Sequence, residues 1–184
     1  MKLLFVIDMQ NDFIDGVLGS PEAQAIVPKV IEKIKNADNV IFTYDTHNKD
    51  YLQTEEGKHL PIPHCIKGTE GWELNPIIFN TPGGIVEHVF MFCKETFGYP
   101  WNLAKDFNYE DFILNPKDVT EIEIVGLDTD FCVLANAMTL KATFPNVPIT
   151  IDAACCAGST PEWHEKALDM LEHCHFNVIN RKKE

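Results

Sequence analysis

The sequence has few positive charges, no long apolar run and no paired-cysteine motif, and these absences narrow the class of protein. Its 184 residues include 15 Lys and Arg against 28 Asp and Glu, which gives a net charge of −13. Clustered cations bind phosphate backbones and anionic lipid surfaces, so this balance argues against nucleic acid or a membrane as a partner. No apolar run approaches the roughly 20 residues that span a membrane. A small-molecule partner is favoured.

The cysteines do not suggest a disulfide framework. The six cysteines form neither a CxxC pair nor a regular spacing, and Cys155 and Cys156 are adjacent. Close to the amino terminus, an apolar run at residues 3–7 meets Asp8, which is too short for the core of a signal peptide. We therefore expect a cytoplasmic protein whose thiols are reduced, so that a thiol is available for chemistry.

The composition is that of an ordinary globular protein. Hydrophobic residues make up 45% of the chain and charged residues 23%. This is too apolar for a disordered chain, and the length is within the range of one hydrophobic core. We expect residues 1–184 to form a single domain.

The order of apolar segments predicts an α/β fold. Six segments are typical of buried strands, namely residues 3–7, 39–44, 84–93, 121–127, 147–151 and 176–179. Helical patterns lie between them, around residues 26–34, 131–143 and 163–174. Alternating strands and helices predict crossover connections, and hence a three-layer α/β/α sandwich with a mostly parallel, Rossmann-like sheet of about six strands. Residues 48–82 are rich in Gly and Pro and predict a long, functional excursion.

Reactive side chains gather at the ends of the predicted strands. Asp8 follows the first strand, Asp45 and His47 follow the second, Lys94 follows the third, and Cys132 comes shortly after the fourth. The carboxyl ends of parallel strands share one edge of a sheet, where ligands of such folds bind. The sequence therefore predicts a functional site at this edge.

Cys132 is the candidate nucleophile. It lies at the start of a predicted helix, where backbone N–H groups and the helix dipole favour a thiolate, and an ammonium from Lys94 would lower its pKa further. Asp8 could accept the thiol proton and return it to a leaving amine. Taken singly, a cysteine is more often a packing residue, Lys94 is more often a surface lysine, and Asp8 could be a turn or helix cap. Their convergence at one edge of the sheet favours a catalytic role for all three.

Three segments carry a family resemblance: DMQNDF at residues 8–13, Lys94 after a strand, and GLDTDFCV at residues 126–133. Together they resemble the isochorismatase-like cysteine hydrolases, which include the nicotinamidases, over nearly the whole chain. The resemblance implies a catalytic triad of Asp8, Lys94 and Cys132. It also implies an oxyanion hole formed by the amides of Asp128 and Cys132, next to a cis Leu127–Asp128 peptide bond.

A second cluster could bind a metal ion. Asp45 and His47 are two positions apart and face the same side of an extended chain, and His64 could return from the excursion as a third ligand. An Asp/His/His set with open positions suits Zn²⁺, Mn²⁺ or Fe²⁺. An Asp-x-His motif alone is a weak signal, because two histidines can simply cap loops.

The family resemblance strengthens the metal hypothesis. Nicotinamidases have a similar Asp-x-His after the second strand and a His-Cys pair leading into a Gly-Thr-x-Gly turn, which here is residues 68–71. Some members add a His or Glu ligand; Gln53 occupies the position of that His, and Glu55 or Glu56 could substitute. We favour Glu56 as the fourth ligand and Zn²⁺ as the ion, with Mn²⁺ or Fe²⁺ as alternatives.

Aromatic residues near the predicted site could bind the substrate. Phe13 matches the aromatic residue that follows the first Asp in the family, and Tyr99 and Trp101 follow Lys94. Large aromatic residues at a strand end are equally typical of a core or a dimer contact. The aromatic stretch 99–112 is compatible with a homo-oligomer surface or with a packed helix.

The resemblance favours a cysteine amidohydrolase that cleaves a small carboxamide, nicotinamide first, to nicotinate and ammonia through a thioester on Cys132. Hydrolysis of another amide, ureido or carbamate compound is the alternative within the family, and vinyl-ether cleavage of isochorismate is disfavoured because it does not need the cysteine. A doubly wound module that binds a nucleotide or flavin is an alternative of another class. No Gly-x-Gly-x-x-Gly motif follows the first strand, which argues against that module.

Overall fold

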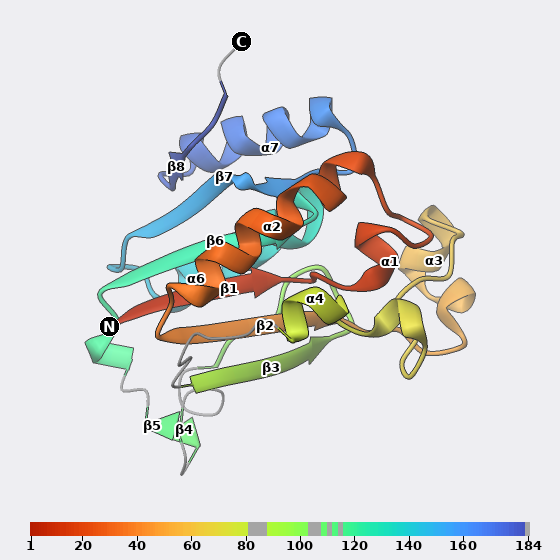
Figure 1. Cartoon of the computed structure of the whole chain (residues 1–184), viewed down its shortest axis with the longest axis horizontal. Coiled ribbons are helices and arrows are strands. Elements are labelled where there is room, and N and C mark those ends of the chain that lie inside the picture. The colour runs from red at the N-terminus through yellow and green to blue at the C-terminus, as the bar shows by residue number, and fades with distance from the viewer. Residues whose placement is uncertain (81–87, 103–107, 110–111, 114–115, 183–184) are drawn as a thin grey trace.

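A six-stranded parallel sheet between two layers of helices forms the body of the protein (Figure 1). The computed structural model describes residues 1–80, 88–102, 108–109, 112–113 and 116–182. The strands run in the order β3-β2-β1-β6-β7-β8, and every neighbouring pair is parallel. Their bounds are β1 Lys2–Ile7, β2 Asn39–Asp45, β3 His88–Lys94, β6 Glu121–Leu127, β7 Ile149–Ala157 and β8 Asn177–Ile179. The predicted fold class is confirmed.

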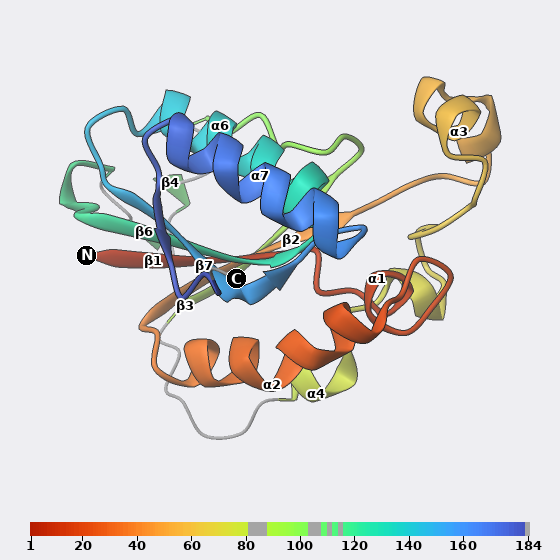
Figure 2. The same cartoon turned by 90° about the horizontal axis from the view of Figure 1, so that it is seen from above.

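Helices cover both faces of the sheet. Helices α2 (Pro21–Lys35) and α4 (Pro76–Phe79) lie on one face, and α6 (Leu134–Thr143) and α7 (Pro161–His173) lie on the other (Figure 2). Two short helices, α1 and α3, lie beyond the carboxyl edge of the sheet, at Asn11–Ile14 and Glu55–His59. The smaller elements are 3-10 turns at Tyr51–Gln53, Glu70–Trp72 and Pro116–Asp118, a π-helical turn at Thr129–Val133, and an antiparallel pair of β4 (Asn108–Tyr109) and β5 (Phe112–Ile113).

Strand β1 shows why the sheet needs two covering layers. Phe5 packs into one buried apolar cluster, together with Leu140 of α6 and Leu168 of α7. Val6 packs into a second cluster with Val30 of α2. Successive side chains of a strand point to opposite faces, so a continuous apolar strand must be buried on both.

The helix starts follow local sequence signals. Ser20 accepts a hydrogen bond from the amide of Ala23 at the start of α2, and Thr160 accepts one from Trp163 at the start of α7. Each cap is followed by a proline at the first helical position, where a missing N–H costs nothing. The sequence Ser-Thr-Pro at residues 159–161 predicts a cap followed by a first-turn proline, and the structure confirms both for α7.

Strand β7 is longer than the sequence predicts. The expected strand ends at Ile151, whereas β7 continues to Ala157 through the adjacent cysteines Cys155 and Cys156. Small, buried residues allow the extension: a register shift between Ile124 and Gly126 lets Gly126 pair with Cys156. Residues 84–87 of the expected third strand lie outside the described residues.

Among the helices of the described residues, none is both long enough and apolar enough to cross a bilayer.

Candidate active site and metal cluster

The carboxyl edge of the sheet collects reactive residues that the strand ends predict. Asp8 directly follows β1, Asp45 and Lys94 end the paired strands β2 and β3, and Cys132 lies in the π-helical turn after β6. Asp45 and Lys94 are Cα partners in the sheet, and the amide of Thr46 donates to the Lys94 carbonyl at 2.8 Å. The parallel sheet thus fixes the backbone from which each side chain projects.

Lys94 lies between the other two members of the predicted triad. Its Nζ is 2.6 Å from Asp8 Oδ2 and donates to Cys132 Sγ at 3.3 Å. All three residues are buried, with exposed fractions of 0% for Asp8, 3% for Lys94 and 4% for Cys132. Burial alone would lower the pKa of Lys94, but Asp8, Cys132 and Asp45 outweigh it and raise that pKa well above its usual value. Lys94 therefore stays charged among acidic groups.

Asp8 has the surroundings of a proton carrier. Burial raises the pKa of its carboxyl group, Lys94 opposes the rise and Asp45 adds to it. Its Oδ1 accepts a 2.6 Å hydrogen bond from the Thr43 hydroxyl. The backbone of Asp8 has φ +47°, a left-handed conformation that Asp adopts more readily than most residues but that still stores strain.

The Cys132 thiol is not acidified in this structure, contrary to the sequence prediction. Burial raises its pKa well above the usual value; Lys94 lowers it, but Asp8 and Asp45 raise it again. The helix start and Lys94 favour a thiolate, but the burial of the sulfur beside two carboxylates opposes it. The resting group is a neutral thiol, so a base must take its proton during attack.

The segment before Cys132 reaches the site without a cis peptide bond. All peptide bonds of the described residues are trans, so the expected cis Leu127–Asp128 bond is wrong. Gly126, inside β6 at the register shift toward β7, has φ +120°, and a Cβ at this position would collide with the backbone of Ile7. A trans bond is also favoured by about 3–4 kcal/mol for a residue other than proline.

Asp128 lies at the predicted oxyanion hole. Its carbonyl accepts hydrogen bonds from the amides of Phe131 and Val133, which shapes the turn that carries Cys132. Burial raises the pKa of the Asp128 carboxyl group to about 8, and the nearby Asp130 and Asp8 add to the rise. The role of the Asp128 and Cys132 amides as oxyanion donors stays a prediction.

The predicted metal ligands converge on one point. One ligand atom from each of four residues lies within 4.8 Å of the others, and the four residues are Asp45, His47, Glu56 and His64. From Asp45 Oδ2 the distances are 3.0 Å to His47 Nε2 and 3.4 Å to His64 Nε2, and from Glu56 Oε1 to His47 Nε2 the distance is 3.5 Å. Glu55 instead pairs with Lys58 at 2.8 Å. The geometry therefore selects Glu56 over Glu55.

These residues fit a divalent cation. The Nε2 of His47 is buried and has no partner aligned for a hydrogen bond, although it faces a carboxylate oxygen. The Nδ1 of His64 lies 2.8 Å from the Ile62 carbonyl, which favours the tautomer whose free Nε2 faces the cluster. Two imidazole nitrogens and two carboxylate oxygens are donors that Zn²⁺, Mn²⁺ and Fe²⁺ accept. The residues present are compatible with such an ion.

Asp45 connects the cluster with the triad. Its Oδ2 faces the two histidines, while its Oδ1 lies 3.4 Å from Lys94 Nζ. Burial alone would raise the pKa of Asp45, but the imidazoles of His47 and His64, followed by Lys94, hold it below its usual range. Asp45 therefore stays ionised between a lysine and the metal cluster.

Gln10 and Tyr51 support this site, and the sequence analysis missed them. The fully buried Gln10 accepts from the Asp45 amide at 2.7 Å and donates to the Asp45 carbonyl at 2.8 Å. Its position two residues after Asp8 in the DMQNDF motif was the available signal. Tyr51 packs against the rings of His47 and His64, at centroid distances of 4.6 and 5.0 Å. Nothing in its own sequence context pointed to that contact.

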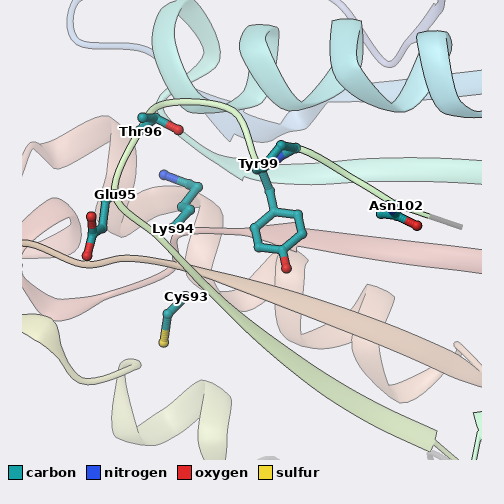
Figure 3. Close-up of a pocket in the computed structure, with 7 residues that line it drawn as sticks. Cys93, Lys94, Glu95, Thr96, Tyr99 and Asn102 are labelled. Atoms are coloured by element: carbon teal, nitrogen blue, oxygen red, sulfur yellow. The ribbon is translucent and has the colours of Figure 1, made fainter. Parts of the chain in front are cut away.

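A cavity of about 430 Å³ opens beside Lys94. Its lining consists of Cys93, Lys94, Glu95, Thr96, Tyr99, Pro100 and Asn102. Figure 3 shows that Cys93 points away from Lys94 and that Tyr99 comes from the segment after β3. One predicted substrate residue, Tyr99, is thus at the cavity.

The other two aromatic residues lie in the core. Trp101 is buried and packs against Phe5, with ring centroids 5.2 Å apart, so the core interpretation holds for Trp101. Phe13 is buried and lies edge-on to the His64 ring at 5.6 Å, and it is not among the residues that line the cavity beside Lys94. Phe13 therefore adjoins the metal cluster, and its role as a substrate contact stays a prediction.

Comparison with known proteins identifies relatives that match most of the chain. The isochorismatase domain model matches residues 2–183. An uncharacterised isochorismatase family protein of Bacillus subtilis is 31% identical over 91% of this chain and 92% of its own, and the nicotinamidase of Saccharomyces cerevisiae is 26% identical over 98% and 100%. The crystal structure of the pyrazinamidase of Pyrococcus horikoshii in complex with zinc is 26% identical, with a TM-score of 0.73 over 98% of this chain and 99% of that one. The chain belongs to the isochorismatase family.

Proposed function

We propose that this protein is a cysteine amidohydrolase that releases ammonia from a small carboxamide, with nicotinamide as the first candidate. The observation that carries the proposal is the position of Lys94 Nζ, 2.6 Å from Asp8 Oδ2 and 3.3 Å from Cys132 Sγ, at a buried sheet edge. The similarity to the yeast nicotinamidase supports the choice of substrate.

The chemistry begins with a neutral thiol. Asp8 takes the proton of Cys132 as the sulfur attacks the amide carbon, and the charged Lys94 stabilises the sulfur while it is negative. Asp8, whose pKa burial raises, then returns the proton to the departing amine, and ammonia leaves. In the second half, Asp8 accepts a proton from water as that water attacks the thioester, and the acid product is released with a neutral thiol on Cys132.

The backbone turn before Cys132 would stabilise the charge on the substrate oxygen. We assign this role to the amides of Asp128 and Cys132. Preorganised N–H donors around a developing oxyanion are among the largest contributions to acyl-transfer catalysis.

The four-residue cluster would hold a divalent metal through Asp45, His47, Glu56 and His64. Zn²⁺ is the first candidate, supported by the mixed nitrogen and oxygen donors and by the zinc-bound relative from Pyrococcus horikoshii. Mn²⁺ and Fe²⁺ are the alternatives. When bound, such an ion supplies a positive charge that can orient or polarise a heteroaromatic ring nitrogen.

Ammonia release across a panel of amides tests the proposal. The panel contains nicotinamide, isonicotinamide, benzamide and a ureido compound, each with and without added Zn²⁺, Mn²⁺ or Fe²⁺. We expect nicotinamide to be the best substrate and Cys132→Ala to reduce its kcat/KM by at least about 1000-fold. Cys174→Ala is the matched control, because Cys174 lies at the end of α7 and should keep wild-type activity. A Cys132→Ala enzyme with the wild-type rate would refute the proposal.

A further inference from the structure

Asn136 links the nucleophile to a segment that is distant in sequence. It is fully buried on α6, one helical turn after Cys132. Its Nδ2 donates to the carbonyls of Cys132 at 2.9 Å and Phe97 at 3.0 Å, and its Oδ1 accepts from the Tyr99 amide at 3.1 Å. One side chain therefore binds the turn that carries the sulfur and the segment that follows β3.

The segment 95–101 lies close against α6 at a second point. At Gly98, a Cβ would approach the Ala135 carbonyl oxygen to 3.1 Å and the Ala135 Cβ to 3.3 Å, closer than most side chains tolerate. The Phe97 ring also contacts the Phe131 ring, with centroids 5.2 Å apart. Hydrogen bonding and close packing thus fix the same contact between segment and helix.

The same segment forms the wall of the cavity beside Lys94. Glu95, Thr96, Tyr99 and Pro100 line that cavity. Figure 3 shows Glu95, Thr96 and Tyr99 on the loop that leaves β3. Asn136 is not among the residues that line the cavity. Its side chain instead makes hydrogen bonds to the backbone of Phe97 and Tyr99 in the cavity wall. A shift of this contact would move the wall relative to Cys132.

The bonding pattern requires a carboxamide side chain. Two of the partners of Asn136 are carbonyl acceptors and one is an N–H donor. An aspartate of the same shape would still accept from Tyr99 but would place a negative charge against two carbonyl oxygens, and a leucine would remove all three hydrogen bonds. These variants separate hydrogen bonding from side-chain volume.

We propose that the cavity beside Lys94 receives the substrate and that Asn136 is a positioning residue, which fixes the wall of this cavity, residues 95–101, relative to the sulfur of Cys132. It acts through the backbone of Phe97 and Tyr99 and sets how well a carboxamide is held, which makes it a determinant of substrate affinity. This inference rests on the proposed amidohydrolase function. A misplacement of about 1 Å in a substrate contact can cost on the order of 100-fold in rate.

The test compares Asn136→Asp and Asn136→Leu with Asn39→Leu. Asn39 is a buried asparagine at the start of β2, at the opposite end of the strand from the site, with a single 3.4 Å bond to the Lys2 carbonyl. Three measurements are made on each protein: hydrogen exchange of the Tyr99 amide, KM and kcat for nicotinamide, and the rate of Cys132 alkylation by iodoacetamide. Iodoacetamide is smaller than nicotinamide and has no aromatic ring for the cavity wall to contact.

We expect both Asn136 variants to raise KM and the exchange rate of the Tyr99 amide by about tenfold or more. Alkylation of Cys132 should change far less than KM, and Asn39→Leu should change none of the three. An unchanged KM in a folded Asn136 variant would overturn the inference. A loss of alkylation in parallel with kcat/KM would also overturn it, because the effect would then lie in the nucleophile.

Gly98→Ala provides an independent variant if the Asn136 variants do not fold. Its Cβ pushes the wall away from Ala135 without removing a hydrogen-bonding group, so KM should rise and alkylation should persist. A wild-type KM in Gly98→Ala would contradict the inference. If the wild-type protein released no ammonia from any amide, the proposed function would fail, whereas the exchange of the Tyr99 amide would still report whether Asn136 fixes the wall.

Discussion

The triad and the metal cluster meet at Lys94 and Asp45, yet the chain builds them in different ways. The triad residues all project from the ends of strands or from the turn after one. The cluster takes Asp45 from a strand end but recruits Glu56 from α3 and His64 from the excursion between β2 and β3. The sheet therefore determines one site, and the folding of a long loop determines most of the other.

Two neighbouring aspartates show what this difference does chemically. Asp8 and Asp45 are both buried, and each has an oxygen near Lys94, at 2.6 and 3.4 Å. Burial raises the pKa of Asp8, whereas the two histidines and Lys94 keep the pKa of Asp45 low despite burial. The strand-end aspartate is suited to carry a proton, and the one facing the loop histidines is suited to bind a cation.

Asp8→Asn should give the largest effect and separate the two regions. The amide cannot take the thiol proton, so we expect kcat/KM to fall by at least about 1000-fold, while the bound metal stays at the wild-type level. Ammonia release and elemental analysis of the same preparation measure the two quantities. Loss of metal in this variant would show that the regions are not separable.

His64→Ala should have the opposite effect: it should weaken metal binding and leave the Cys132 thiol unchanged. Removing one of four ligands should weaken metal binding by at least about 100-fold, because even groups behind a ligand contribute about 10–100-fold. Cys132 should remain as reactive toward iodoacetamide as in the wild type. Metal titration measures the affinity for the ion, and the alkylation rate measures the reactivity of Cys132. A parallel loss of both would show that the triad and the metal cluster are not separable.

Two adjacent glutamates test which residue is the fourth metal ligand. Glu56→Gln should weaken metal binding by about tenfold, because it removes a charged oxygen 3.5 Å from His47 Nε2. Glu55→Gln should have no effect, since Glu55 pairs with Lys58 at the surface. Metal titrations of the two variants side by side test this, and equal affinities would remove Glu56 from the ligand set.

Thr43→Val should have the smallest effect, on the pH profile of the triad. The Thr43 hydroxyl hydrogen bond lowers the pKa of Asp8, so its loss raises that pKa further. Asp8 must be ionised to accept the thiol proton, and the acid limb of kcat/KM should therefore move to higher pH. A profile of kcat/KM against pH, compared with that of wild type, checks the direction; a shift to lower pH would be inconsistent with Asp8 as the base.

Much of the fold was predictable from the sequence because it rests on local patterns. Apolar strands, a capped proline helix start and helical periodicity are properties of short windows, and they predicted the layers and the parallel sheet. The grouping of Asp8, Lys94 and Cys132 followed as well, since parallel strands bring their carboxyl ends to one edge. The longer β7 was missed because its extension depends on pairing with Gly126 on β6.

Errors arose where surroundings outweigh local chemistry. A low pKa was predicted for the Cys132 thiol, but the cost of burying its charge beside two carboxylates raises that pKa. The expected cis bond before Asp128 was inferred from resemblance, whereas the peptide bonds of the described residues are all trans.

The sequence by itself determined the excess of acidic residues, the lack of a long apolar run, the α/β order of elements, and the reactive residues at the strand ends. Only the tertiary structure decided that Glu56 and not Glu55 joins the histidines, that Gln10 holds Asp45, and that Asn136 binds the cavity wall. These contacts join residues from distant parts of the chain through hydrogen bonds of fixed geometry. Their partners depend on how the loops return to the sheet, which no short stretch of sequence specifies.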